Sequence, residues 1–435
     1  MKRKRYGMIA ALLASAVLCG CSDISEGAEG AEGHFVHTES AGETSAEEPD
    51  VIAVLVTDEE PKPAKPPVRT YTAEDTAAFH DRIEEIREEC WVYGMSVAVF
   101  DNGRVIYSDG FGLADRENEI PCTPDTIFRA ASVSKTISTM LLMQLCDKGL
   151  ISPESDLEEL TGLPFNSEYA GGRVKLWHLL THTAGLTDTN TFELGISQKY
   201  KTETVLRTAL IGTKPGECYN YSNFGAGLVG TVIELVTGEY FQDYADRNMF
   251  APLGMDAGYA RDFIEHKENC AKIYDYDGEI YDPAGWGRTA YYYESFGLGN
   301  SYLQAQSELL ITAPDLARLG TALAGDGTVP ECGGVSIISP ASLGEMHKKR
   351  ISTEQYDMGL NVRIYDGTLV PGRVMYGHTG NALGAITGIF YDREDHTGIA
   401  VMSNRCNYYV DDTTGVYKML YLSVNEAYKT FFDRG

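Results

Sequence analysis

The sequence predicts an α+β fold, in which an antiparallel β-sheet is flanked by helices and carries a helical subdomain. Three observations lead to this prediction. The folded part begins with a helical pattern and a hairpin, continues through a long and mostly helical region, and ends in several strand-like segments. Strands at both ends of a chain, separated by helices, are typical of one sheet built from both ends.

The first predicted elements follow Tyr71, where the folded part begins. Apolar side chains recur at helical spacing in residues 73–89, which predicts an amphipathic helix. Two β-rich segments follow at residues 96–100 and 104–112. The turn Asp-Asn-Gly that joins them favours a β-hairpin.

The last predicted elements are strands and one helix. Four segments near the C-terminus look like strands: residues 358–365, 373–380, 385–392 and 397–404. A final amphipathic segment, over about residues 412–432, predicts a helix.

Composition limits the classes of partner. The chain has 435 residues and a formal net charge of -27, and 43% of its residues are hydrophobic. That apolar share is enough for a sizeable core. A nucleic-acid interface needs a basic surface, so this composition argues against nucleic acid as a partner.

The N-terminus has the features of an export signal. Residues 1–20 hold four basic residues and then a short apolar run, too short to span a bilayer comfortably. The stretch LCGC that ends at Cys21 resembles a bacterial lipobox. The resemblance implies cleavage before Cys21, a lipid on its sulfur, and an extracytoplasmic protein anchored to a bacterial membrane. A plain secretory signal with a chance cysteine is the alternative.

The segment after the signal differs from the rest of the chain. Residues 21–70 contain EGAEGAEG, many acidic residues and PKPAKPP. Charge repulsion and proline favour an extended and solvated tether. Residues 71–435 are then the folded domain.

A serine and a lysine stand three residues apart at the predicted start of a helix. Ser132 and Lys135 would share one face of its first turn. A neutral lysine can take the proton of a serine hydroxyl if its pKa is lowered. The alternative is that Ser132 is an ordinary helix N-cap.

A second motif precedes another predicted helix, within residues 218–238. Tyr221 and Asn223 form a Y-x-N pattern on the entering loop. A phenol can relay protons if a nearby cation lowers its pKa, and an amide can hold a lysine. The alternatives are a core tyrosine and an N-cap asparagine. His182, in LLTHTAG, is interpreted as closing a helix.

A third motif lies on a predicted strand near the C-terminus, where His378, Thr379 and Gly380 are consecutive. A glycine there would let a substrate backbone lie against the strand edge. His378 could donate a hydrogen bond or carry charge. The alternative is a satisfied strand histidine.

The three motifs in this order resemble the serine β-lactamase and penicillin-binding protein family. The branch most similar contains class C β-lactamases, D-alanyl-D-alanine carboxypeptidases and esterases. Three further stretches fit the family: LLTHTAGL (179–186), FAPLGM (250–255) and TAPDLARL (312–319). The resemblance covers roughly residues 75–430 and implies the same α+β fold, with the active site between the sheet and the helical subdomain.

The resemblance also implies catalytic roles. Ser132 would be the acylated nucleophile, and Lys135 and Tyr221 would share the duties of general base and general acid. Asn223 would position Lys135 and the substrate. The backbone N–H groups of Ser132 and Asn381 would form the oxyanion hole. His378, Thr379 and Gly380 would line the substrate-binding edge.

The family implies a serine hydrolase without a metal or cofactor, and no Cys/His cluster of this sequence has zinc spacing. Its substrates would be D-amino acid peptides, β-lactams or small esters. His378 stands where many members have lysine, and a neutral imidazole attracts a carboxylate less than an ammonium does. The alternative function is a catalytically weak lipoprotein that binds cell-wall peptides or β-lactams.

Overall fold

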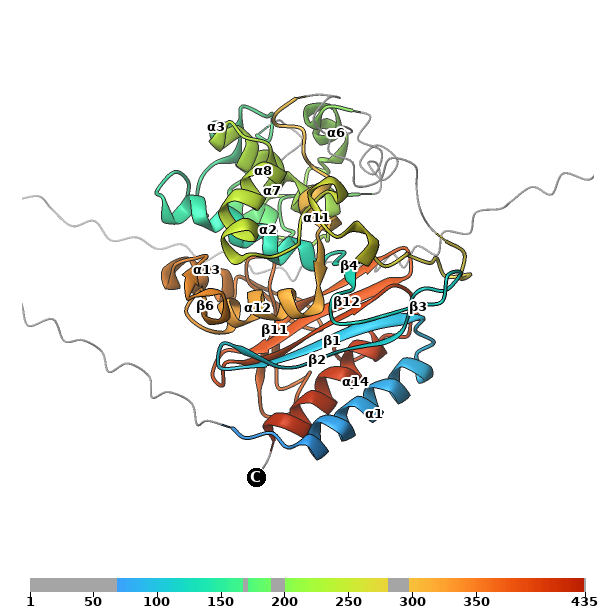
Figure 1. The fold of residues 1–435 in the computed structure, drawn as a ribbon. Coiled ribbons are helices and arrows are strands. Elements are labelled where there is room, and N and C mark those ends of the chain that lie inside the picture. Colours follow the sequence, from blue (N-terminus) through green and yellow to red (C-terminus); the bar gives the residue numbers. More distant parts are fainter. Residues whose placement is uncertain (1–68, 167–170, 189–199, 281–296, 434–435) are drawn as a thin grey trace, which may run out of the picture. The chain divides into compact units, whose positions relative to one another are not determined.

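A nine-stranded antiparallel sheet forms the centre of the part of the chain that the structure describes (Figure 1). This structure is a computed structural model, and it describes residues 69–166, 171–188, 200–280 and 297–433. The signal, Cys21 and nearly all of the predicted tether lie outside these residues. The strands, in their order across the sheet, are β3 (Ile120–Pro121), β2 (Arg104–Asp115), β1 (Gly94–Asp101), β13 (Thr397–Ser403), β12 (Ala385–Asp392), β11 (Val374–Ala382), β10 (Arg363–Asp366), β9 (Asp357–Met358) and β8 (Ile351–Ser352).

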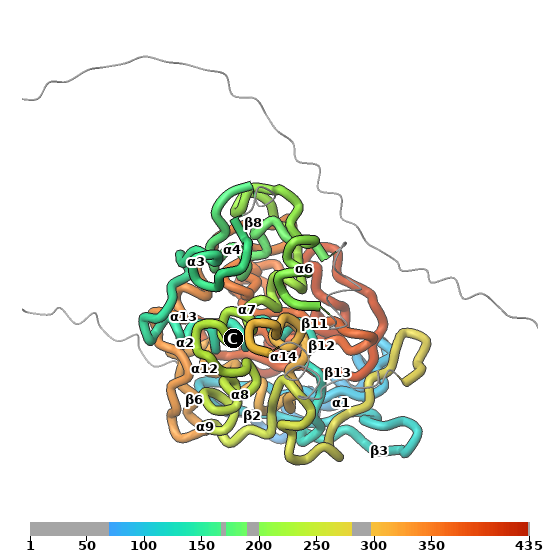
Figure 2. The backbone as a smooth tube through the Cα atoms, turned by 90° about the horizontal axis from the view of Figure 1, so that it is seen from above, coloured from blue at the N-terminus to red at the C-terminus, as the bar shows by residue number. Residues whose placement is uncertain are grey.

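The two ends of the folded chain meet in the middle of this sheet. Strand β1 pairs with β13 from Met95 opposite Ser403 to Asp101 opposite Thr397. Figure 2 accordingly shows the blue start of the domain beside its red end. The prediction of one antiparallel sheet built from both ends is confirmed.

The hairpin β1–β2 forms where the sequence predicts it. Asn102 and Gly103, between the strands, have φ angles of 48° and 82°. Asparagine and glycine tolerate this left-handed conformation, which matches the twist of the flanking strands.

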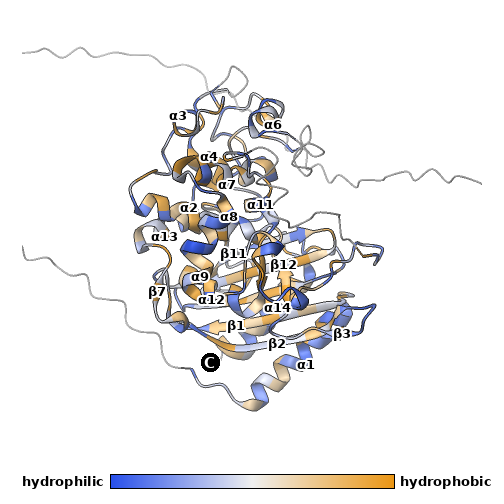
Figure 3. Cartoon of the chain, turned by 45° about the horizontal axis from the view of Figure 1, so that its top comes forward, coloured by the Kyte–Doolittle hydropathy of each residue, from blue (hydrophilic) through white to orange (hydrophobic). Residues whose placement is uncertain are grey.

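Helices cover both faces of the sheet. Helix α12 (Ala313–Ala324) contacts β1, β12 and β13 on one face, while α1 (Ala73–Glu89) and α14 (Lys418–Ala427) lie on the other (Figure 1). The helices therefore shield both faces of the sheet from solvent, and strands β1, β12 and β13 are buried along their whole length. Figure 3 shows hydrophobic residues along β1 and β12 and on helix α12.

The helical subdomain packs beyond α12. Helices α2 and α7 form its centre and contact each other, and nearly every side chain of both is buried. The helices of this region are α2 (Val133–Asp147), α3 (Leu157–Thr161), α4 (Leu176–Leu180), α6 (Thr202–Ala209), α7 (Asn223–Thr237), α8 (Phe241–Ala245), α9 (Ala251–Leu253) and α11 (Gln304–Ser307).

Short elements complete the described chain. They are the strands β4 (Ile127–Arg129), β5 (Leu310–Thr312), β6 (Thr328–Val329) and β7 (Val335–Ser336), helix α13 (Pro340–His347), and the single turns η1 (Asp246–Phe250), η2 (Arg261–Phe263), η3 (Lys267–Asn269), η4 (Pro330–Cys332) and η5 (Tyr428–Phe432). Among the described residues, six cysteines are free thiols: Cys90, Cys122, Cys146, Cys270, Cys332 and Cys406. No helix in the described ranges is long and apolar enough to cross a membrane.

The last helix begins later than the sequence predicts. Helix α14 starts at Lys418, not near residue 412. The side chain of Asp411 accepts hydrogen bonds from the backbone N–H and the hydroxyl of Thr414. This local turn competes with helix formation, as aspartate side chains often do.

Candidate active site

Ser132 lies at the entrance to α2, and its hydroxyl does not cap the helix. The residue takes the N-cap position, but its side chain makes no capping hydrogen bond. Ala131, just before it, has a φ of 47°, a conformation that costs energy for a residue with a Cβ. This backbone brings the Ser132 hydroxyl to Lys135 and Tyr221, so the N-cap alternative does not explain it.

The buried side chain of Lys135 contacts the hydroxyl oxygen of Ser132. Its Nζ lies 3.0 Å from Ser132 Oγ, 2.8 Å from Asn223 Oδ1 and 2.8 Å from the backbone oxygen of Gln306. The two carbonyl oxygens only accept hydrogen bonds. A neutral amine that donates to both must therefore turn its lone pair toward Ser132.

The surroundings of Lys135 favour this neutral form. The side chain is fully buried, and burial is the main cause that lowers its pKa from 10.5 to about 7. The charge of Asp188 opposes this effect, while the cationic Arg363 and Arg129 add to it. The lysine is therefore available as a base near neutral pH.

Tyr221 contacts the same serine from another element. Its hydroxyl lies 3.0 Å from Ser132 Oγ. The sequence argument needs a lowered pKa, but burial raises the pKa of Tyr221 to about 12, and Arg363 only partly opposes this. Tyr221 thus stays protonated, as a hydrogen-bond donor toward Ser132.

Asn223 begins α7 but does not cap it. Ser222 is the N-cap, because its side chain accepts a hydrogen bond from the backbone N–H of Gly225. The carboxylate of Asp188 accepts hydrogen bonds from Asn223 N at 2.7 Å and Asn223 Nδ2 at 3.0 Å. These contacts turn Oδ1 of Asn223 toward Lys135. Asp188 was not predicted from the sequence.

His182 closes helix α4, as the sequence predicts, and it also contacts the site: its backbone N–H donates to the oxygen of Leu179 at 3.2 Å. It follows α4 with a φ of 57°, and its ring lies 4.3 Å from that of Tyr221, centroid to centroid. The backbone N–H of Ser222 donates to its Nδ1. Burial holds the pKa of His182 well below its usual value, so a neutral imidazole supports Tyr221.

Glu234 holds the segment that leads to Gln306. This buried side chain on α7 accepts hydrogen bonds from the backbone N–H of Phe241 at 3.1 Å and of Gly299 at 2.7 Å. Burial raises its pKa to about 7, against the effect of these and neighbouring N–H groups. Helix α7 thereby positions both groups that accept hydrogen bonds from Lys135. Asn223 belongs to α7 itself, and the backbone oxygen of Gln306 is positioned through the segment that Glu234 holds.

Strand β11 brings the third motif to the site. Strand β10 pairs with β11 only as far as Arg363 opposite Gly377. Among the described residues, positions 378–382 of β11 therefore pair with β12 alone. Their other edge is open beside the serine, as the predicted binding of an added strand requires.

The side chains of the third motif divide between the interior and this edge. His378 is fully buried, and burial with the nearby Arg363 holds its pKa well below the usual value. A charged His378 is therefore excluded near pH 7. Arg363 Nη1 donates to Thr379 Oγ1 at 2.8 Å, so this arginine supplies the cation that the histidine does not.

Gly380 has a packing reason for lacking a side chain. A Cβ there would lie 2.5 Å from the backbone oxygen of Ala130 and closer still to Thr387 Oγ1. The missing side chain lets β11 approach the start of α2. Asn381 follows, with its side chain among three tyrosine hydroxyls.

The sequence missed Asp188 and Arg363. Asp188 contacts Asn223, which lies 35 residues further along the chain, and no local sequence pattern indicates this contact. Arg363 left one signal, because it is the one charged residue in the mostly apolar segment at residues 358–365, which is predicted to be a strand. No cluster of three or more possible metal ligands occurs in the described part of the chain.

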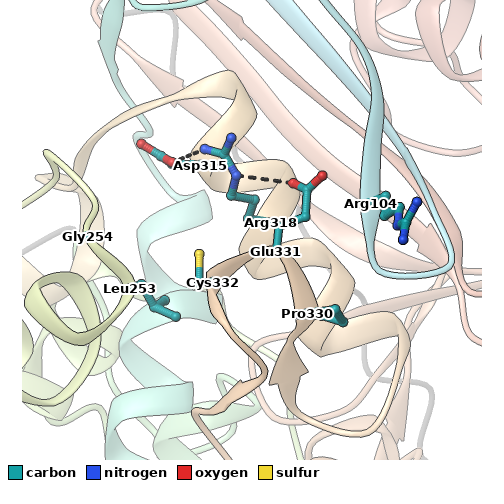
Figure 4. Close-up of a pocket in the computed structure, with 8 residues that line it drawn as sticks. All are labelled: Arg104, Leu253, Gly254, Asp315, Arg318, Pro330, Glu331 and Cys332. Atoms are coloured by element: carbon teal, nitrogen blue, oxygen red, sulfur yellow. Dashed lines mark hydrogen bonds and ion pairs between the residues drawn. The ribbon is translucent and has the colours of Figure 1, made fainter.

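A cavity of about 700 Å³ lies apart from these residues. Figure 4 shows its lining, in which Arg318 pairs with Asp315 at 2.6 Å and with Glu331 at 3.3 Å. Its charged groups are largely satisfied by each other, and none of its lining residues belongs to the three motifs.

One relative of known name matches most of the folded part, and another matches about half of it. Penicillin-binding protein 4 of Amycolatopsis lactamdurans is 24% identical over 317 residues, which are 70% of this chain and 79% of the relative. Protein flp of Staphylococcus aureus is 26% identical over 180 residues, 40% of this chain. The match spans only 36% of that relative.

Solved structures share the fold. A penicillin-binding protein homologue from Pyrococcus abyssi is 25% identical with a TM-score of 0.63, covering 81% of this chain and 78% of that one. A class C β-lactamase mutant is 21% identical with a TM-score of 0.62, covering 81% of this chain and 99% of that one. The model of the β-lactamase family matches residues 79–420. The chain therefore belongs to the β-lactamase family, a family of serine hydrolases.

Proposed function

We propose that this protein forms an acyl-enzyme on Ser132 and hydrolyses peptides that end in a D-amino acid with a free carboxylate. β-Lactams and small esters are further substrates of the same nucleophile. One observation carries the proposal: Ser132 Oγ lies 3.0 Å from both Lys135 Nζ and the Tyr221 hydroxyl. A nucleophile in contact with both a base and a proton donor is what acyl transfer needs.

Acylation begins with Lys135. Its lone pair takes the proton of Ser132 as Oγ attacks the carbonyl carbon of the substrate. The resulting oxyanion is held by the backbone N–H groups of Ser132 and Asn381, and such donors contribute about 3–4 kcal/mol in comparable enzymes. Asn223 and the Gln306 oxygen keep the lysine in place throughout, through their 2.8 Å contacts.

Tyr221 completes the step. When the carbon–nitrogen bond breaks, the leaving nitrogen needs a proton, and the Tyr221 hydroxyl, a donor 3.0 Å from Ser132 Oγ, can supply it. The proton on Lys135 then restores the phenol. In the second half of the reaction, water attacks the ester carbonyl, gives its proton to the same base, and Ser132 leaves as the free hydroxyl.

The open edge of β11 orients the substrate. Arg363 and Thr379 lie at the end of this edge nearest β10. A peptide that adds antiparallel to β11 would place its C-terminal carboxylate there. A bidentate guanidinium contact favours a carboxylate. This arrangement supports the carboxypeptidase type of substrate over a neutral ester, with His378 and Gly380 forming the floor beneath it.

An exported and lipid-anchored location fits such a substrate. The basic n-region, the apolar run and LCGC ending at Cys21 support it. Metabolic labelling of the full chain in a bacterial host with an alkyne fatty acid should label the wild type but not Cys21→Ser. Equal labelling of the two would contradict the anchor.

Covalent trapping tests the nucleophile. Intact-mass spectrometry after a fluorophosphonate or penicillin probe should show one adduct on the wild type and none on Ser132→Ala. A wild type without an adduct, or an adduct that survives in Ser132→Ala, would refute the proposal.

A turnover panel separates the substrate classes. We expect hydrolysis of N-acetyl-D-Ala-D-Ala, and slower turnover of a chromogenic ester and a β-lactam. The buried neutral His378, where many relatives have lysine, favours one other candidate: a lipoprotein that binds such peptides without hydrolysing them. Binding without any product release in this panel would support that candidate instead.

A further inference from the structure

Three tyrosines gather around the side chain of Asn381. The hydroxyls of Tyr276 and Tyr408 donate to Asn381 Oδ1 at 3.2 and 3.3 Å. Asn381 Nδ2 donates to the Tyr417 hydroxyl at 2.6 Å. We call Tyr276, Tyr408 and Tyr417 the tyrosine cluster. They come from two segments far apart in the sequence, joined through one amide.

The cluster presents ring carbons to solvent. Tyr276 and Tyr408 are 44% and 39% exposed, although their hydroxyls point inward at Asn381. Their ring centroids lie 3.9 Å apart. Water therefore meets aromatic surface at a place where the phenol oxygens are already hydrogen-bonded. Exposed aromatic surface of this kind beside an active site is typical of a ligand contact.

The cluster lies on one definite side of the reacting bond. Arg363 and Thr379 hold the carboxylate end of the proposed substrate, on the leaving-group side. Asn381 is two residues further along β11, and at about 3.3 Å per residue it lies about 7 Å away. An antiparallel substrate therefore passes its scissile bond near Gly380 and its acyl group near Asn381.

We propose that the tyrosine cluster is a binding subsite for an aromatic acyl group on the substrate, attached to the amine of the residue before the scissile bond. This inference rests on the proposed function. An aromatic ring can stack on the rings of Tyr276 and Tyr408 or contact their edges. This contact does not desolvate an unpaired hydroxyl, because both tyrosine hydroxyls already donate to Asn381.

A cationic acyl group is a poorer fit. Arg405 donates from Nη2 to the backbone oxygen of Tyr276 at 3.0 Å. The carboxylate of Asp275 is also close to Tyr276, so a positive charge on the substrate would meet a guanidinium as well as a carboxylate beside the cluster. A small acyl group such as acetyl would leave the rings exposed.

Matched substrates test the subsite. We compare phenylacetyl-, acetyl- and 6-aminohexanoyl-D-Ala-D-Ala, which share one scissile bond and one leaving group. The expected kcat/KM is about two- to tenfold higher for phenylacetyl than for acetyl, the range that aromatic contacts supply. In the double variant Tyr276→Ala/Tyr408→Ala this ratio should fall to about 1.

Two control variants separate the ring from other effects. Tyr408→Phe keeps the ring and should retain the ratio, even if the lost hydrogen bond to Asn381 lowers all rates. Tyr409→Ala removes the adjacent tyrosine, which is 69% exposed and outside the cluster, and should change neither rate nor ratio. A ratio near 1 in the wild type, its survival in the double variant, or a preference for 6-aminohexanoyl would overturn the proposal.

Affinity measurements distinguish this proposal from the proposed function. In Ser132→Ala, which lacks the nucleophile, calorimetry should show that phenylacetyl-D-Ala-D-Ala binds about two- to tenfold tighter than acetyl-D-Ala-D-Ala. Equal affinities would overturn the subsite whether or not the wild type turns over. An intact affinity ratio in a wild type without turnover would refute the proposed hydrolysis and leave the subsite standing.

Discussion

The pKa of Lys135 predicts how acylation depends on pH. Burial lowers this pKa from 10.5 to about 7. At pH 7 about half of the molecules then hold a neutral Lys135, whereas an ordinary lysine is neutral in roughly one molecule in 3000. Because only the neutral form accepts the proton of Ser132, acylation should be about tenfold slower at pH 6 than at its plateau, and about a hundredfold slower at pH 5.

Single-turnover acylation by a chromogenic β-lactam or ester, measured from pH 5 to 10, checks this profile. Lys135→Arg is the matched control, since a guanidinium keeps its proton throughout this range. Its acylation should be slower by about 10²–10⁴ and should lack the rise near pH 7. A wild-type rate that keeps rising to a midpoint near pH 10 would refute our assignment of the base.

The same pKa should appear in the stability of the fold. The unfolded chain holds the lysine proton up to about pH 10.5, while the folded protein releases it near pH 7. The contribution of Lys135 to the free energy of unfolding therefore rises with pH between these values, by about 1.4 kcal/mol per pH unit. Urea unfolding at pH 7, 8 and 9 should show this slope in the wild type relative to Lys135→Met. Identical slopes would contradict the lowered pKa.

Three further predictions follow from side chains around the site. Arg363→Gln should lower kcat/KM for acetyl-D-Ala-D-Ala by about 10- to 100-fold, the value of a charged hydrogen bond, while a carboxylate-free ester should change by less than about threefold; an equal loss on both would contradict carboxylate binding. Glu234→Gln should lower the free energy of unfolding by about 1–3 kcal/mol at pH 5. Since the folded pKa of Glu234 is raised to about 7, its contribution to wild-type stability should decline from pH 4.5 to 7, and urea unfolding should show no such decline in the variant. Gly380→Ala should cost about 1–3 kcal/mol and most of the activity, because its Cβ would lie 2.5 Å from the Ala130 oxygen; Gly344→Ala, in a helix with open space around the new Cβ, should instead stabilise the protein by about 0.5–1 kcal/mol in thermal unfolding.

The elements with strong local signals could be predicted from the sequence. Apolar spacing predicted the helix at residues 73–89, which is α1, and the Asp-Asn-Gly turn predicted the β1–β2 hairpin. The buried helix that ends at Gly238 also forms, with that glycine in the left-handed conformation. Each of these signals lies within a few residues of the element that it specifies, so no tertiary contact was needed to read it.

The parts of the site that depend on tertiary packing could not be predicted. The three motifs could be found by type and order, but the pKa of Tyr221 depends on burial among distant elements and shifts in the opposite direction to the predicted one. Asp188 contacts Asn223 from a separate loop. Arg363 reaches the open edge only because β10 begins at this residue, opposite Gly377. None of these relations is periodic or local.

The central strand β1 cannot complete its pairing until the distant strand β13 is present. Met95 pairs with Ser403, which lies 308 residues further along the chain (403 − 95). Such a high contact order slows folding, because a long loop must close before the central strands gain their hydrogen bonds. A nascent chain that stops before Thr397 lacks the partner of β1 and leaves a hydrophobic strand edge open to aggregation. The centre of the sheet therefore closes only after strand β13 has been synthesised.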